Sequence, residues 1–302
     1  MKIKNNRGSL IVLIFMVIGI FFTLLYHAYL GYSKYKEVHH SLENIELINK
    51  IEGLLSDIDK ERIHSAIYMG TNHKEDLVKL EKYRDVVNYG LEDVFGLLKK
   101  DENLLAQQYL IRDISSNLIY TRSRVDVLSM EYDHIFFENY VTKVVTPLME
   151  VIKSLSFASS VPSSYFELLN SKENLYTEKS FIVFLLSGQK AMNHKDLLQW
   201  EQFLEEDIYS SKSLELLTRL RGEIFINSST GAYGVSLKDW ILAHEENNSM
   251  LEKREQVIIL EVKKSIEDKL STLKYKIIKY LLASFALFII VLILLFSYQK
   301  NV

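Results

Sequence analysis

Two long uncharged runs lie near the ends of the 302-residue chain, and the charged residues lie mainly between them. The first run covers residues 8–33 and the second covers residues 280–299. A helix of about 20 apolar residues crosses the hydrocarbon core of a bilayer. The pattern therefore predicts two transmembrane helices with a folded domain between them. The predicted boundaries are a tail at 1–9, a transmembrane helix at 10–32, a domain at 33–279, a second transmembrane helix at 280–297 and a tail at 298–302.

The polar middle of the chain is predicted to be all-α. Its apolar residues recur at helical spacing, no stretch alternates with the period of a strand, and only Pro147 and Pro162 interrupt it. Glycine and asparagine clusters mark the breaks between helices. The expected helices cover residues 33–70, 74–99, 102–136, 138–156, 163–188, 194–207, 210–227 and 236–298.

Four cations lie on faces of these helices that are otherwise apolar. Arg62 follows Ile51, Leu55 and Ile58 at helical spacing. Arg122, Arg221 and Lys179 occupy the middle of three similar stripes. An unpaired charge in such a place costs several kcal/mol, roughly, even after relaxation. Each of the four cations therefore needs an anion or trapped water.

Two interpretations of these cations stay open. Neighbouring carboxylates, at Glu61, Asp126 and Glu178, are able to neutralise them in a purely structural network. Alternatively, the cations stay partly unpaired and form a pocket for a small anion between helices. The chain has nine arginines against 27 lysines, and the guanidinium fork suits a planar oxyanion. An anion that draws repelling cations together would favour one packing of the helices over another, as a receptor requires.

Composition argues against several other classes of protein. The chain has no cysteine, which excludes disulfides, thiolate metal sites and cysteine nucleophiles. A net charge of -3 gives no indication of nucleic-acid binding. No phosphate-binding glycine loop, zinc-hydrolase helix or nucleophile–base pair stands out. We therefore predict neither an enzyme, nor a metal site, nor a cofactor.

The middle segment contains a faint internal repeat. Glu61-Arg62 precedes a helix that closes at Gly70, and Glu178-Lys179 precedes one that closes at Gly188. Two similar helical halves fit this spacing.

Several motifs in chain order resemble the bacterial nitrate- and nitrite-sensing (NIT) domain. They are LLSDIDKERIHSAIYMG at 54–70, RSRVD at 122–126 followed by FFENY at 136–140, LYTEKS at 175–180, and the stretch from Arg221 through Gly231 to Trp240. The resemblance covers about residues 40–270. No single motif is specific, but the ordered series is.

The resemblance implies a fold and a ligand. The fold would be two packed helical bundles, with nitrate, nitrite or a similar small anion bound between them. The family's binding arginines fall on Arg62, with Arg122 and Arg221 as further matches. Lys179 stands where the family has an arginine, which keeps the charge but loses the fork.

The resulting hypothesis is a signal-transduction receptor of the bacterial inner membrane with a periplasmic domain. Positive charge gives no clear orientation, because the inner flanks would carry four cations and the outer flanks five. Family receptors usually continue into an output domain, whereas this sequence ends at Val302. We therefore expect a separate signalling partner and allow for a homodimer. The alternative is a helical membrane scaffold, or a shortened receptor, that has lost ligand sensing.

Overall fold

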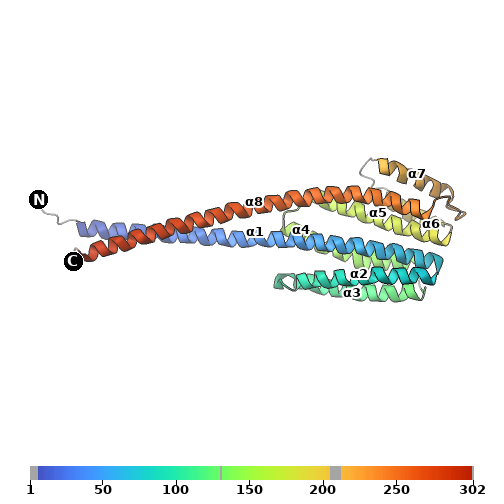
Figure 1. Ribbon diagram of the computed structural model, residues 1–302, viewed down its shortest axis with the longest axis horizontal. Helices are drawn as coiled ribbons and strands as arrows, with labels where there is room; N and C mark the ends of the chain where they lie inside the picture. Colours follow the sequence, from blue (N-terminus) through green and yellow to red (C-terminus); the bar gives the residue numbers. More distant parts are fainter. Residues whose placement is uncertain (1–5, 130, 205–211, 301–302) are drawn as a thin grey trace. The chain divides into compact units, whose positions relative to one another are not determined.

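The computed structural model of the protein describes residues 6–129, 131–204 and 212–300, and every regular element within these ranges is a helix. Two predicted helix ends, at residues 207 and 210, and the outer parts of both predicted tails lie outside the described residues. Figure 1 shows the order of the helices along the chain. Their bounds are α1 Asn6–Thr71, α2 Lys74–Leu98, η1 Glu102–Leu104, α3 Leu105–Asp126, η2 His134–Val145, α4 Thr146–Ala158, α5 Ser163–Gly188, α6 His194–Leu204, α7 Lys212–Ile226 and α8 Leu237–Lys300.

The chain divides into two compact units. Residues 44–260 form the first, here called the helical domain, and residues 1–43 with 261–302 form the second, here called the apolar unit. The helical domain therefore lies inside the predicted boundaries of 33–279. The helices α1 and α8 each contribute to both units.

The helical domain buries the apolar stripes that the sequence predicted. On α1, Ile45, Ile48, Ile51 and Ile58 are completely buried at the spacing of one helix face. The helix α3 packs against α2, η2 and α4, and α5 packs against α6 and η2. Burial of these faces supplies the main driving force for folding of the domain.

The prediction of a single helix over 102–136 is wrong. The α-helix α3 ends at Asp126, and Leu128 has a positive φ of 49° that turns the chain. A new helix starts at Tyr132, becomes the π-helix η2 at His134 and continues directly into α4. In the sequence, Tyr132 and Phe136 continue the helical spacing of the apolar stripe around Arg122, which is why one helix was expected. Instead, Tyr132 stacks on Phe136 and on Phe184 of α5, with ring centroids 4.0 Å and 4.2 Å apart.

In the apolar unit, α1 and α8 run side by side. The ring of Phe21 lies 6.2 Å from that of Phe288, and a Cβ at Gly31 would lie 3.0 Å from Ile277. A glycine at this position lets the two backbones approach closely, as in packed transmembrane helices.

Both helices are long and apolar enough to cross a membrane. Only 6% of the most apolar 18-residue window of either helix is buried, unlike the apolar face of a core helix. Large side chains such as Phe15 and Phe296, each 70% exposed, would be costly in water. These observations indicate association with a membrane.

Candidate functional site

Arg62 lies inside the helical domain with 1% of its surface exposed. Its Nη1 donates to Glu173 Oε1 at 2.7 Å and to the Thr177 hydroxyl at 3.3 Å. Its Nη2 donates to Asp59 Oδ1 over a long 3.5 Å. The Nε donor is buried and has no hydrogen-bond partner among the described residues. Burial opposes the charge of this guanidinium, but Glu173 and Asp59 raise its pKa above the ordinary value, so Arg62 stays charged.

Lys179 shares a carboxylate with Arg62. The Lys179 Nζ lies 2.6 Å from Asp59 Oδ2, and both side chains are buried. Asp59 on α1 therefore lies between a guanidinium from its own helix and an ammonium from α5. Two of the four predicted cations therefore meet at one buried carboxylate. The anion is a side chain of the protein itself.

Arg122 and Glu61 form a closed pair. Arg122 Nε and Nη2 donate to the two oxygens of Glu61 at 2.8 Å and 2.6 Å. The Tyr140 hydroxyl also donates to Glu61 at 2.9 Å, and Arg122 Nη1 donates to Asn88. Glu61 is completely buried, and this two-pronged geometry is the most favourable for a guanidinium and a carboxylate.

Arg221 and Glu178 form a second closed pair. Arg221 Nε and Nη2 donate to the two oxygens of Glu178 at 2.7 Å and 2.6 Å, and the Trp200 indole donates to the same carboxylate at 2.9 Å. His244 lies 3.7 Å from Glu178. Burial, helped by Lys179 and Arg221, lowers the pKa of His244 well below its ordinary value, so this histidine is neutral at pH 7.

The two closed pairs repeat one arrangement in the two halves of the domain. Glu61 on α1 accepts the fork of an arginine on α3, and Glu178 on α5 accepts one from α7. In each half the arginine comes from the second α-helix after the glutamate. The glycines that close α1 and α5 also lie close together, because a Cβ at Gly70 would meet the Cβ of Ser187 at 2.7 Å. These contacts match the spacing of the internal repeat.

The structure thus brings together some of the predicted site residues and separates others. Arg62 and Lys179 meet at Asp59, whereas Arg122 and Arg221 each bind their own glutamate. Glu61 and Glu178 neutralise cations as the pairing interpretation expected. Asp126 instead forms its ion pair with a different arginine, Arg84, at 2.7 Å.

Two carboxylates at the centre of this network were missed by the sequence analysis. Asp59 precedes Arg62 by one helical turn, a spacing that signals a contact on the same face. Glu173 is 111 residues away from Arg62, so nothing local in the sequence indicates their contact. Asp59 and Glu173 together balance the two positive charges of Arg62 and Lys179.

A further buried ion pair links α5 and α8 away from these cations. Lys172 Nζ lies 2.5 Å from Glu255 Oε2, and Glu52 accepts a hydrogen bond from Tyr165 nearby. Burial raises the pKa of Glu255 to about 7, an effect that Lys172 opposes and Glu52 reinforces. Glu52, Lys172 and Glu255 border a cavity of 510 Å³ lined by α1, α5 and α8.

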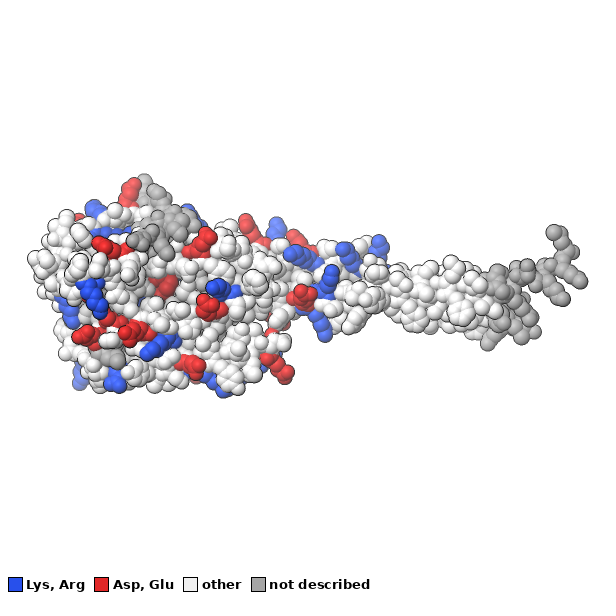
Figure 2. Space-filling view, turned by 180° about the vertical axis from the view of Figure 1, so that it is seen from behind, with Lys and Arg blue, Asp and Glu red and all other residues white. Residues whose placement is uncertain are grey.

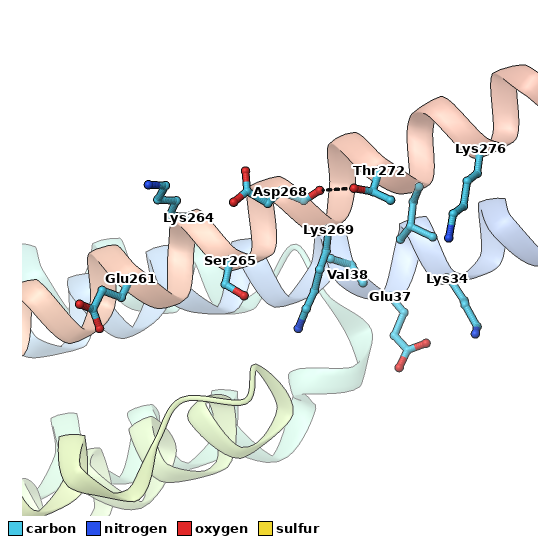
Figure 3. Close-up of a pocket in the computed structure, with 11 residues that line it drawn as sticks. Lys34, Glu37, Val38, Glu261, Lys264, Ser265, Asp268, Lys269, Thr272 and Lys276 are labelled. Carbon is cyan, nitrogen blue, oxygen red and sulfur yellow. Dashed lines mark hydrogen bonds between the residues drawn. The ribbon is translucent and has the colours of Figure 1, made fainter.

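Neither this cavity nor a larger one of 820 Å³ in the apolar unit (Figure 3) is lined by the four predicted cations. Because Arg62 is only 1% exposed, its guanidinium is reached from solvent only if a neighbouring side chain moves. Glu173 is the most exposed partner of Arg62, at 13% against 4% for Asp59.

Within the described parts of the chain, no group of three or more histidine, aspartate or glutamate side chains is arranged to hold a metal ion.

Comparison of the chain with protein-family models, with curated proteins and with solved structures finds no match. The resemblance to the nitrate- and nitrite-sensing domain therefore stays a prediction that rests on the motifs quoted above.

Proposed function

We propose that the protein is a membrane-anchored receptor whose helical domain binds a small planar oxyanion, nitrate or nitrite, at Arg62. One observation carries the proposal. A completely buried guanidinium keeps an unpartnered Nε donor while it holds a carboxylate, itself a planar oxyanion, on Nη1. A buried donor without a partner is costly unless a ligand or water satisfies it. The Nε atoms of Arg84 and Arg124 are in the same state, but both side chains are less buried than Arg62.

The mechanism that fits this geometry is an exchange of anions. Nitrate has the charge of the Glu173 carboxylate, so replacing one by the other on Arg62 leaves the local balance of charge unchanged. Glu173 is the partner nearest to solvent, and it regains hydration when it leaves. The Thr177 hydroxyl, which now contacts both Arg62 and Glu173, is free to donate to the incoming anion.

The exchange would change the contact between two parts of the domain. We propose that α1–α4 and α5–α8 are two packed helical bundles, because each half repeats the glutamate–arginine pair described above. Arg62 belongs to the first half, and Glu173, Thr177 and Lys179 belong to the second. Loss of the Arg62–Glu173 bond would shift the relative stability of two packings, which is the requirement for a signal.

The placement of the receptor is part of the same proposal. The helices α1 and α8 both continue from the helical domain into the apolar segments, so each is able to carry a small shift towards the membrane. We place the protein in the bacterial inner membrane with the helical domain in the periplasm, acting on a separate signalling partner and able to form a homodimer. The resemblance supports this placement.

A second candidate function is a helical membrane scaffold that binds no anion. The observation that favours it is that each of the four cations already has a carboxylate partner. In that case the buried network only fixes the packing of the helices, and partner proteins recognise the outer surface.

Calorimetric titration of the full chain in detergent distinguishes the two candidates. We expect nitrate or nitrite to bind the unaltered protein and to bind Glu173→Gln more tightly, because the neutral amide competes less well for Arg62. The matched control is Glu167→Gln, an exposed glutamate on the same helix, which should bind like the unaltered protein. Absence of binding to all three proteins would favour the scaffold.

A further inference from the structure

The cavity of 820 Å³ lies in the apolar unit, between α1 and α8. Val38 and Leu273 give it an apolar part, and charged side chains surround them (Figure 3). Lys34 and Lys276 lie at the same end of the cavity in this view. The complete lining is Lys34, Glu37, Val38, Glu261, Lys264, Ser265, Asp268, Lys269, Thr272, Leu273 and Lys276.

The two residues at that end belong to a group of lysines that directly adjoins the uncharged runs. This lysine collar comprises Lys34, Lys36, Lys274, Lys276 and Lys279. No acidic residue precedes Glu37 in the sequence and none follows Asp268, so none lies between the collar and the uncharged runs. Glu37 itself adjoins Lys36 and lines the same cavity. Figure 2 shows charged side chains reaching one border of an uncharged stretch of surface.

The collar lies at the depth of lipid headgroups if the uncharged runs cross the bilayer. Its lysines are one to six residues from the end of the nearer run. At 1.5 Å per residue they are within about 10 Å of the hydrocarbon edge, and a lysine side chain extends several ångströms further. The headgroup layer of a bilayer occupies roughly this interval.

The collar lysines also lack protein partners. None of them forms an ion pair with any described residue, although Lys36 stacks over the Tyr32 ring. By contrast, buried lysines in the helical domain, such as Lys172 and Lys179, each hold a carboxylate. Five adjacent unpaired ammonium groups repel one another, and an anion among them relieves this repulsion.

We propose that the lysine collar is a binding site for an anionic phospholipid. The phosphate lies at the end of the cavity between Lys34 and Lys276, and the acyl chains follow the apolar surfaces of α1 and α8. A lipid is favoured over a free phosphate because the collar is continuous with apolar surface that needs a hydrocarbon neighbour. The site requires only that the runs cross a bilayer, so it does not depend on nitrate binding or on the orientation of the domain.

The test uses the full chain in an uncharged detergent, titrated with phosphatidylglycerol or phosphatidylcholine while retained lipid is counted by native mass spectrometry. The protein should bind phosphatidylglycerol at least tenfold more tightly than phosphatidylcholine. The ratio of the two affinities should fall as salt is added, because salt screens the charges of the lysines. Lys34→Gln combined with Lys276→Gln should weaken phosphatidylglycerol binding roughly 25-fold, since one lysine near an anionic lipid contributes about fivefold.

The matched control is Lys253→Gln combined with Lys263→Gln, which removes the same charge from α8 farther from the uncharged run. It should change the affinity less than twofold. Equal affinity for the two lipids, or an equal loss in the control, would overturn the proposal. So would inorganic phosphate that displaces phosphatidylglycerol at equal concentration, because the site would then recognise free phosphate.

Discussion

Arg62 differs from Arg122 and Arg221 of the same helical domain in how completely its donors are used. Around Arg122 and Arg221, a glutamate accepts both prongs of the guanidinium, and aromatic donors satisfy the same carboxylate. Around Arg62, Glu173 and Asp59 bind different nitrogens and the Asp59 contact is long. The Nε atom has no hydrogen-bond partner in the part of the chain that the structure describes. All three arginines looked alike in the sequence, because each lies in an apolar stripe.

The two arrangements differ in the expected cost of opening the contact between arginine and glutamate. A two-pronged pair whose glutamate is completely buried is expensive to open, because opening leaves that carboxylate charged and without solvent. A single-pronged contact to a carboxylate that solvent partly reaches is cheaper to open. In the proposed receptor, the comparison favours Arg62 over Arg122 and Arg221 as the position where a ligand competes.

The largest effect should follow from opening one closed pair. Glu178→Gln removes the charge that neutralises Arg221 and should lower the free energy of unfolding by about 3–5 kcal/mol. The measurement is chemical denaturation of the full chain in detergent. Glu223→Gln, an exposed change on α7, should alter stability by less than about 0.5 kcal/mol. A loss below about 1 kcal/mol in Glu178→Gln would contradict the expected high cost of opening a two-pronged pair.

The ion pair between Lys172 and Glu255 should make the stability of the helical domain depend on pH. The pKa of Glu255 rises from 4.5 to about 7 on folding, with Glu52 and Glu252 adding repulsion. The folded state therefore binds this proton more tightly than the unfolded state, and the contribution of Glu255 to stability falls as pH rises from 4.5 to 7.

The lowered pKa of His244 has the opposite effect, because it makes stability rise with pH. His244 is present in both the unaltered protein and Glu255→Gln, so the difference between their free energies of unfolding isolates the effect of Glu255. The unaltered protein should lose about 2–3 kcal/mol relative to the variant between pH 5 and pH 8. Denaturation curves at four pH values in this range are sufficient. Parallel pH profiles for the two proteins would show that Glu255 titrates normally.

The smallest effect should come from the contact between Arg62 and Glu173. Glu173→Gln should cost only about 1–2 kcal/mol, because Asp59 continues to neutralise Arg62. Added nitrate should restore part of this loss in the variant and have less effect on the unaltered protein. Thermal unfolding with nitrate against an equal concentration of chloride measures the rescue. Equal responses to the two salts would mean that the anion acts only by screening.

The prediction from sequence was accurate where local pattern decides structure. The all-α class is confirmed, and the expected helices at 74–99 and 163–188 match α2 and α5 to within one residue. The expected helix over 102–136 failed because Tyr132 and Phe136 continue the spacing of the Arg122 stripe across a turn. The ring of Tyr132 stacks on Phe184, and a local periodicity cannot reveal that long-range contact.

The sequence by itself determined two apolar helices that need a non-aqueous surrounding, a helical domain between them, and four cations on its buried faces. It did so because hydrophobic period and run length are local properties of the chain. Only the tertiary structure decided which carboxylate each cation meets, since Glu173 reaches Arg62 across 111 residues and Arg122 reaches Glu61 across 61. Charge pairing depends on which helices pack together, and that packing follows from the apolar faces of the whole domain.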